Sequence, residues 1–339
     1  MKHVFNILSI VALAVLGVAL VLSLQNWMSG AIELPGQFYT FTTIFLGIFI
    51  EAAPFLLLGT LASGFVEVFF KKESIQRIMP RNRFLGALVG GLLGFVFPVC
   101  ECGVVPLTRR LFRKGMAPAM GVAFLMASPV LNPIVILSTY AAYGWGPVLW
   151  LRIGLSLAIA VGIGLIFAVE EQPERLLRPR SLSLAPIRGG SVDLAVPMHQ
   201  GSLASRVRRA LGIAGEEFFE MGRYLIIGSM LAAALQALVP QGTLLALGSG
   251  PLLSVLVMML LAVLLSICST VDAFVSLAFV GTFTTGSILS FLVFGPMVDI
   301  KNILLYMQVF RRRTVLYMVI LPALMVILAT VFINLNLGI

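Results

Sequence analysis

Residues 84–107 read FLGALVGGLLGFVFPVCECGVVPL, an apolar run that a proline and a Cys-Glu-Cys turn interrupt. A helix over the residues before the break, Phe84 to Phe97, is only ~21 Å long, whereas the hydrocarbon core of a bilayer is about 30 Å thick. Basic clusters flank the run, with five Lys and Arg within 71–83 and four within 109–114. Because the positive-inside rule puts both clusters in the cytoplasm, the sequence predicts a re-entrant hairpin whose tip, at 98–103, lies near the midplane.

The rest of the chain is equally apolar. Of its 339 residues, 60% are hydrophobic and 11% are charged, whereas soluble domains carry roughly 25% charge. We therefore predict an all-α polytopic membrane protein. The first apolar run exceeds the roughly 7–15 residues of a secretory signal core, so we expect it to be retained as an extra N-terminal span. The apolar runs cover about 4–24, 38–70, 84–107, 117–143, 147–169, 218–239, 251–280, 288–310 and 315–332.

The basic residues predict the orientation of these spans. The remaining clusters are Lys2, seven residues within 175–209 and three within 311–313. We expect all clusters, and with them the N-terminus, to be cytoplasmic. The formal net charge of +9 is then a topology signal and not a sign of nucleic-acid binding. The connecting segments that lack Lys and Arg are 25–36, 144–146 and 240–250.

Several function classes are excluded by what the chain lacks. Its two histidines, His3 and His199, lie outside the apolar runs, so a buried histidine relay is not expected. No segment matches the phosphate-binding pattern GxxxxGK[ST], and no GxGxxG opens a helix after a strand. We therefore expect neither ATP nor a dinucleotide to bind by these routes, and no cofactor.

Three pairs of segments predict an internal repeat. Residues 51–59 resemble 220–228, Cys100-Glu-Cys matches Cys268-Ser-Thr, and 128–132 match 295–299, at offsets of 169, 168 and 167. Each copy would hold three spans and one hairpin, so the second copy would be inverted, as in many transporters. The alternative is chance similarity among leucine-rich segments. The expected divisions are an N-terminal span and external loop (1–37), a first repeat (38–169), a flexible cytoplasmic linker (170–213) and a second repeat (214–339).

Helix breaks inside the membrane indicate the candidate site, because backbone can break in lipid only where it faces protein or water. Four breaks, at 98–106, 128–133, 266–272 and 295–301, converge near the bilayer centre if the repeat is inverted. Ionisable side chains are costly there and are functional candidates. Asp299 and Lys301 share a break and could neutralise each other. Glu51 and Glu101 have no partner nearby in sequence, so they are better candidates for carrying a proton or a cation.

Two further groups of residues have a second interpretation. Asn132 takes the position equivalent to Asp299, where its amide could contact a substrate or cap an exposed half-helix. Glu220, Arg223 and Arg152 lie near span ends, and we interpret them as interfacial or snorkelling side chains.

The three cysteines of the chain all lie at the two predicted hairpin tips. Thiols from facing tips could form a trigonal sulfur site for a soft ion, such as trivalent arsenic or a d10 metal. The alternative is that Cys100, Cys102 and Cys268 act as small apolar residues in tight turns. A disulfide between Cys100 and Cys102 is not expected, because the two residues are too close in sequence for relaxed geometry.

The site predicted from the residues is therefore a polar centre between the tips. The candidate metal ligands are the three thiols, and the candidate coupling residues are Glu51, Glu101 and Lys301. The candidate substrate-binding residues are Cys100, Glu101, Cys102, Ser128, Asn132, Cys268, Asp272 and Asp299.

Five strings carry a family resemblance: FPVCECGVVPL, ASPVLNPIVILST, EEFFEMGRYLIIG, ICSTVDAFVSLAFVG and GPMVDIKN. They resemble the bacterial "predicted permease" family that includes the organoarsenical efflux permeases, over nearly the whole chain from about Phe38. The resemblance implies an inner-membrane permease, and thiophilic metalloid or metal efflux is the best-known activity in that family. The motif positions are Cys100, Glu101, Cys102, Ser128, Pro129, Asn132, Pro133, Asp272, Asp299 and Lys301.

Two functional hypotheses compete. The first is a secondary transporter that works by alternating access and moves a small ion or metalloid across the bilayer. The second is a membrane subunit or pore that depends on a partner protein docked on the basic linker, 170–213. An intramembrane enzyme is least favoured, because it would need an aspartyl pair of Asp272 and Asp299.

Overall fold

The computed structural model describes residues 36–70, 72–73, 80, 82–97, 99–170, 172–178, 203–238 and 250–336. The predicted N-terminal span and external loop (1–37) lie almost entirely outside these ranges, as does 179–202 of the predicted linker. Within the described ranges the chain is helical, and the only β pairing is two isolated bridges.

Six helical stretches among the described residues are long and apolar enough to cross a membrane. This confirms the prediction of an all-α polytopic membrane protein. The stretches are Phe38–Phe69, Pro118–Tyr143, Pro147–Phe167, Leu203–Ala237, Thr285–Val309 and Arg312–Asn336.

The helices fall into two halves along the chain. The first half holds α2 (Gly36–Phe69), α4 (Arg83–Val96), α5 (Glu101–Arg113), α6 (Pro118–Leu131), α7 (Pro133–Tyr143) and α8 (Pro147–Phe167). The short α9 (Pro173–Leu176) follows. The second half holds α11 (Leu203–Leu238), α13 (Leu253–Leu265), α14 (Asp272–Ser276), a 3-10 turn (Leu277–Phe279), α15 (Thr285–Met297), α16 (Ile300–Val309) and α17 (Arg312–Asn336).

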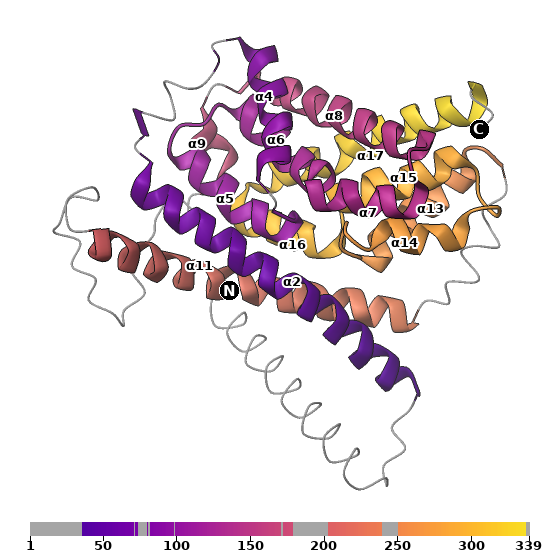
Figure 1. Ribbon diagram of the computed structural model, residues 1–339, viewed down its shortest axis with the longest axis horizontal. Helices are drawn as coiled ribbons and strands as arrows, with labels where there is room; N and C mark the ends of the chain where they lie inside the picture. Colours follow the sequence, from indigo (N-terminus) through magenta and orange to yellow (C-terminus); the bar gives the residue numbers. More distant parts are fainter. Residues whose placement is uncertain are drawn as a thin grey trace, which may run out of the picture.

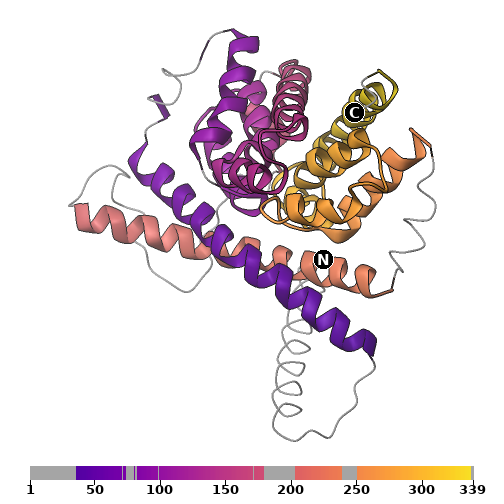
Figure 2. The same cartoon turned by 45° about the vertical axis from the view of Figure 1, so that its right-hand side comes forward.

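The two halves form separate lobes that are joined by two long helices. Figure 2 shows the lobe of α4 to α8 beside the lobe of α13 to α17, with α2 and α11 below both. In Figure 1 these two helices lie side by side and run in opposite directions, and they pack along each other. This antiparallel arrangement is the one that an inverted repeat requires, and the inverted relation of the complete halves stays a prediction.

Short helices and breaks occur where the sequence predicts hairpins. α4 ends at Val96 and α5 begins at Glu101, while α13 ends at Leu265 and α14 begins at Asp272. α4 has 14 residues and α13 has 13, too few to cross a bilayer. One boundary is wrong: Pro106 was expected in the first break but lies inside α5. Proline is tolerated within membrane helices because neighbouring groups satisfy the freed backbone. The re-entrant path through a bilayer stays a prediction.

The two broken spans are capped in the same way. Asn132 separates α6 from α7, and its side-chain oxygen accepts a hydrogen bond from the N–H of Ile134 at 3.0 Å. Asp299, at the equivalent position, separates α15 from α16 and accepts from the N–H of Asn302 at 2.6 Å. Both side chains thus satisfy backbone groups that a helix break leaves without partners.

The described part of the predicted linker is more ordered than expected. α11 begins at Leu203, so 203–213 is helix and not linker, because its first turns continue the amphipathic helix that packs on α2. Upstream, the segment 173–178 lies against the junction of α16 and α17. The N–H of Arg178 donates to the carbonyl of Val309, and the N–H of Arg311 donates to the carbonyl of Leu176, both at 2.9 Å.

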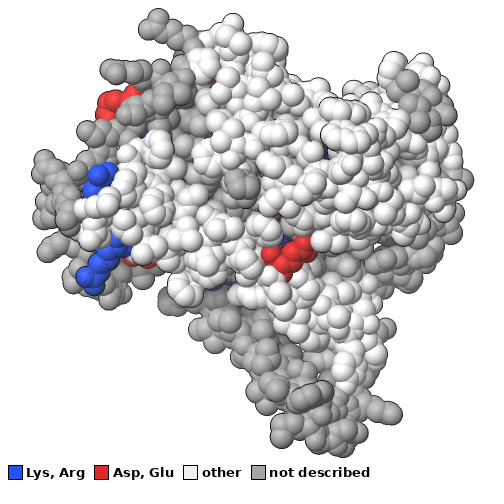
Figure 3. All heavy atoms as spheres, viewed as in Figure 1, with Lys and Arg blue, Asp and Glu red and all other residues white. Residues whose placement is uncertain are grey.

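Basic side chains gather at one end of the molecule. Figure 3 shows the visible Lys and Arg of this face mainly at its left end, with acidic atoms at the upper left and near the centre. There the Lys114 ammonium donates to the carbonyls of Glu67 (2.7 Å) and Phe70 (2.5 Å), where a cation complements the C-terminal end of α2. Burial lowers the pKa of Lys114. The Arg206 guanidinium stacks 4.4 Å from the centre of the Phe69 ring. This grouping agrees with the prediction that the clusters share one side of the membrane.

Exposed aromatic rings mark the connection between α7 and α8. Trp145 lies 4.9 Å from Tyr140 and 5.9 Å from Trp150, measured between ring centres. In Figure 1 this connection is at the right, away from the end with the basic residues. Aromatic residues of this kind are enriched at membrane interfaces, which fits an external boundary at 144–146.

A glycine pair sets how closely the first hairpin approaches α2. A Cβ atom built at Gly59 would overlap the backbone of Gly103, which lies in the first turn of α5. The contact therefore requires that neither helix carry a side chain at this point, and it holds the tip next to α2.

We expect Gly59→Ala to destabilise the protein by about 1–3 kcal/mol, since the methyl group forces the two backbones apart. Gly47→Ala is the matched control, because it lies on the same helix and a Cβ there meets no atom within 4 Å. Thermal unfolding of the purified protein in detergent measures both variants. Equal unfolding temperatures for the two would show that the close contact does not hold the tip.

Candidate functional site

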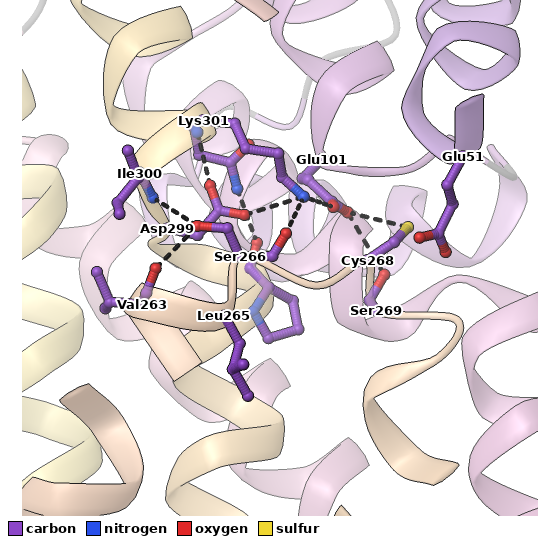
Figure 4. Close-up of polar contacts among 12 residues, drawn as sticks. Glu51, Glu101, Val263, Leu265, Ser266, Cys268, Ser269, Asp299, Ile300 and Lys301 are labelled. Carbon is purple, nitrogen blue, oxygen red and sulfur yellow. Dashed lines mark hydrogen bonds and ion pairs between the residues drawn. The ribbon is translucent and has the colours of Figure 1, made fainter. Parts of the chain in front are cut away.

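A buried lysine brings together three separate segments at the centre of the structure. The Lys301 ammonium lies 3.2 Å from Oε1 of Glu101 and 3.1 Å from Oδ2 of Asp299, and it donates to the carbonyl of Ser266 at 2.8 Å. We call Glu101, Cys268, Ser269, Asp299 and Lys301 the tip cluster. Figure 4 shows these side chains pointing toward one another between the first tip, the second tip and the break before α16.

The second tip also contacts two carboxylates. Oε2 of Glu101 lies 3.9 Å from the Cys268 sulfur and 3.5 Å from the Ser269 hydroxyl. The Thr270 hydroxyl donates to Oε1 of Glu51 at 3.1 Å. Glu51 belongs to α2, and Figure 4 shows its carboxylate near Cys268. Two of the three predicted coupling residues, Glu51 and Glu101, thus meet at one tip, and the third, Lys301, pairs with Glu101.

Local backbone geometry positions the lysine. Ser266 ends α13 in the left-handed conformation, with φ of 45°, and it is the only non-glycine residue with positive φ in the described ranges. Its hydroxyl accepts a hydrogen bond from the N–H of Ile300 at 3.3 Å. Because Asp299 caps the start of α16, Lys301 falls in the first turn of that helix, facing Ser266 and Glu101.

The charges of the tip cluster are almost entirely removed from solvent. Glu101, Asp299 and Lys301 are each 1% exposed. Buried ions are stable only when they are paired and hydrogen-bonded, so these three side chains depend on one another. Sequence reasoning identified Asp299 as a counter-ion of Lys301 but missed Glu101, which is 200 positions away in the chain.

The three thiols also meet at the tips. The Cys100 side chain contacts the thiols of Cys102 and Cys268, and all three cysteines are free and buried. Among the described residues, no group of three or more His, Cys, Asp or Glu is arranged to hold a metal ion. The thiol site for a soft ion therefore stays a prediction.

Asp272 pairs with a buried arginine of the first half. Its Oδ2 accepts from NH2 of Arg152 at 2.6 Å, and NH1 of Arg152 donates to the Thr139 hydroxyl at 2.8 Å. We call Arg152 and Asp272 the α8–α14 pair. The interpretation of Arg152 as an interfacial or snorkelling residue is wrong, because it is 1% exposed and pairs with a buried aspartate. Asp272 and Asp299 each have their own cation, unlike a carboxylate pair that shares a proton.

Ser128 and Asn132 are buried beside the first broken span. Asn132 caps α7, and Ser128 lies where α4 crosses α6, opposite Gly94. No hydrogen bond among the described residues joins either side chain to the tip cluster. Their role in substrate binding stays a prediction.

A second ionic network lies toward the end where the basic residues gather. NH1 of Arg109 pairs with Oε2 of Glu220 at 3.0 Å, and Arg110 lies 3.5 Å from Oε1 of Glu217 and 3.6 Å from Oε2 of Glu67. We call these five residues the α5–α11 network. Sequence reasoning interpreted Arg109 and Arg110 only as part of a cytoplasmic basic cluster, and it gave Glu220 an interfacial role as the alternative to a functional one. The signal it missed is Glu217 and Glu220 one helical turn apart in an apolar helix.

Six apolar helical stretches, two of them broken, together with buried, paired charges define a multi-pass membrane protein with a polar interior. The model of a family described as "Predicted permease" matches residues 37–335. The chain belongs to this predicted permease family, as its motifs indicated.

Three relatives illustrate the breadth of the similarity. The UPF0718 protein YcgR of Bacillus subtilis (strain 168) is 44% identical over 289 residues, which are 84% of this chain and 93% of the relative. The "Putative two-component membrane permease complex subunit" of Streptococcus mutans is 36% identical over 87% of this chain and 95% of its own length. The UPF0718 protein YraQ of Escherichia coli (strain K12) is 24% identical over 46% of this chain and 41% of its own. No solved structure matches.

We expect Lys301→Met to destabilise the protein by about 3–5 kcal/mol, because Glu101 and Asp299 would lose their buried cation. Adding Glu101→Gln is expected to recover part of that loss. Arg175→Met is the control, since it breaks the exposed pair with Glu170 and should have little effect. Thermal unfolding in detergent measures the stability of each variant. Equal destabilisation of Lys301→Met and of the double variant with Glu101→Gln would contradict the paired-ion account.

Proposed function

We propose that this membrane protein is a secondary transporter of the bacterial inner membrane that exports a thiophilic metalloid or metal species, or a small organic derivative of one. The basic end would face the cytoplasm, together with the N-terminus. The observation that carries the proposal is the contact of Glu101 of the first half with Cys268 and Lys301 of the second half at one buried centre. The free, buried thiols of Cys100 and Cys102 lie in the same tip as Glu101.

The position of this centre supports transport by alternating access. Cys100 and Glu101 come from the first half, and Cys268 and Lys301 come from the second. A solute bound to all of them would bridge the two halves. Small movements of one half against the other would then change the side from which the solute is reached.

The acidic residues support coupling to an ion gradient. The chain has no nucleotide-binding motif, so the driving force would come from protons or another cation. Glu51 is half-buried and contacts the same tip as Glu101. In this scheme Glu51 and Glu101 carry the coupling charge, and Lys301 pairs with Glu101 and Asp299 when no solute is bound.

We expect replacement of Cys100, Cys102 and Cys268 by Ser to abolish resistance to the solute, because oxygen is a poor ligand for soft ions. The measurement is growth inhibition of cells that express the wild type, the triple variant or no protein, in the presence of arsenicals, antimonite and soft metals. Resistance of the wild type indicates export, and sensitisation indicates uptake. Full resistance in the triple variant would reduce the thiols to packing residues.

The coupling residues are tested separately. Glu51→Gln and Glu101→Gln are expected to slow gradient-driven transport into inverted vesicles by roughly 10²-fold or more, as for the loss of a positioned proton-transfer group. Glu170→Gln is the control, because Glu170 pairs only with an exposed arginine in the described ranges. Unchanged transport in both Glu variants would exclude this coupling scheme.

A second candidate function is a membrane subunit that works with a partner protein. The streptococcal relative is named as a subunit of a two-component membrane permease complex, and the alignment covers 95% of its length. In this case the basic linker, 170–213, would be the docking segment. Reconstitution of the purified chain alone separates the two candidates, since substrate-dependent flux without a partner favours the first.

A further inference from the structure

Each hairpin is attached by an ion pair to the opposite half of the molecule. α5, which carries the first tip in the first half, pairs through Arg109 and Arg110 with Glu220 and Glu217 of α11 in the second half. α14 follows the second tip in the second half, and its Asp272 pairs with Arg152 of α8 in the first half. The α5–α11 network therefore joins the hairpin of the first half to the second half, and the α8–α14 pair joins the hairpin of the second half to the first.

The tips lie between these two ionic contacts. Arg109 is eight residues from Glu101 along α5, about 12 Å toward the basic end. On the other side, Asp272 lies four residues after Cys268, and its N–H donates to the Cys268 carbonyl at 3.1 Å. In Figure 1, α7 and α14 lie to the right of α5, on the side of the aromatic connection. Each ionic contact is thus on the chain segment that carries a tip, one on either side of the thiols.

Both contacts are closed in this structure. Arg109, Arg110, Arg152, Glu217 and Asp272 are all buried, and so are the three thiols. Glu220 is the exception, since its side chain is 33% exposed and borders solvent. The second carboxylate oxygen of Glu220 accepts from the Gln308 amide at 3.0 Å, and the Ser63 hydroxyl donates to Glu217 at 2.5 Å.

Ion pairs suit a contact that must open and close. A buried pair adds little net stability compared with apolar residues, because desolvation offsets the attraction between its charges. When the halves separate, water hydrates both ions and compensates for the lost contact. The closed and open states then differ little in free energy, so a bound solute can shift the balance between them.

We propose that the α5–α11 network and the α8–α14 pair are the two gates of the permeation pathway. The network closes the thiols off from the basic side, and the pair closes them off from the opposite side. This assignment rests on the transporter function proposed above. The proposal makes Arg152 a gate residue, whereas the sequence analysis interpreted it as a side chain at the membrane–water interface.

The native cysteines report directly on the gates. A membrane-impermeant maleimide is added to spheroplasts to probe the external side, and to inside-out vesicles to probe the cytoplasmic side. Labelling of Cys100, Cys102 and Cys268 is then read by mass spectrometry. The readout needs neither a solute nor transport activity.

Asp272→Asn removes the charge of the α8–α14 pair and keeps the size of the side chain. We expect it to raise external labelling roughly tenfold or more, a shift of about 1.4 kcal/mol in the closed–open equilibrium. Labelling from the cytoplasmic side should stay as in the wild type. The double variant Glu217→Gln and Glu220→Gln should show the converse pattern, and Glu170→Gln should change neither side.

The proposal would be overturned if the two gate variants were labelled to the same extent as the wild type from both sides. It would also be overturned if each variant raised labelling equally from both sides. If Asp272→Asn does not fold, as judged by gel filtration, Arg152→Gln, which removes the other charge of the same pair, replaces it with the same expected rise on the external side. The double variant Arg152→Asp and Asp272→Arg exchanges the two charges and should again protect the cysteines from external labelling. If this double variant is labelled as strongly as Asp272→Asn, the proposal is also overturned. If labelling is side-specific but the protein gives no resistance to metalloids, the gate assignment stands and the proposed solute is rejected.

Discussion

A lysine ammonium enclosed by oxygens from three chain segments is the interaction on which the rest of the structure depends. Lys301 and Glu101 form a buried ion pair, and removing one partner of such a pair is strongly destabilising because it leaves the other charge uncompensated. The two residues belong to opposite halves. Any conformation that buries this cation must therefore bring the first hairpin tip against the break before α16, and that requirement fixes how the halves meet.

The backbone around the cluster follows from the same requirement. A carbonyl oxygen is available to Lys301 only because α13 ends at Ser266 in a left-handed turn, and a carboxylate is available because α16 starts after a break at Asp299. Both ends leave polar groups that lipid cannot satisfy. The break and the ion pair are thus complementary: the lysine uses an acceptor that the helix end exposes, and the helix end is stabilised by the lysine.

Local features of this fold could be predicted from the sequence, whereas its long-range pairs could not. Short apolar runs, prolines and an Asn or Asp before a new helix identify the breaks, because each has a local physical cause. The alternative that Asn132 caps a half-helix agrees with the structure. In contrast, the choice of Arg152 as the partner of Asp272, 120 positions away, depends on tertiary packing. Charges at span ends resemble snorkelling residues until their partners are known, which explains why Arg152 was misinterpreted.

In the transporter that we propose, the charge count at the centre restricts the solutes that this arrangement can accept. Lys301 faces two carboxylates, so the tip cluster has one more acidic group than basic groups, and Glu51 adds a further acidic group at the same tip. An anion brought into this low-dielectric site would increase the excess of negative charge, at a cost that grows as water is excluded. A cation, or a neutral species that binds to thiols, would not. The thiols and the acidic excess therefore favour the same class of solute, which is soft and without negative charge.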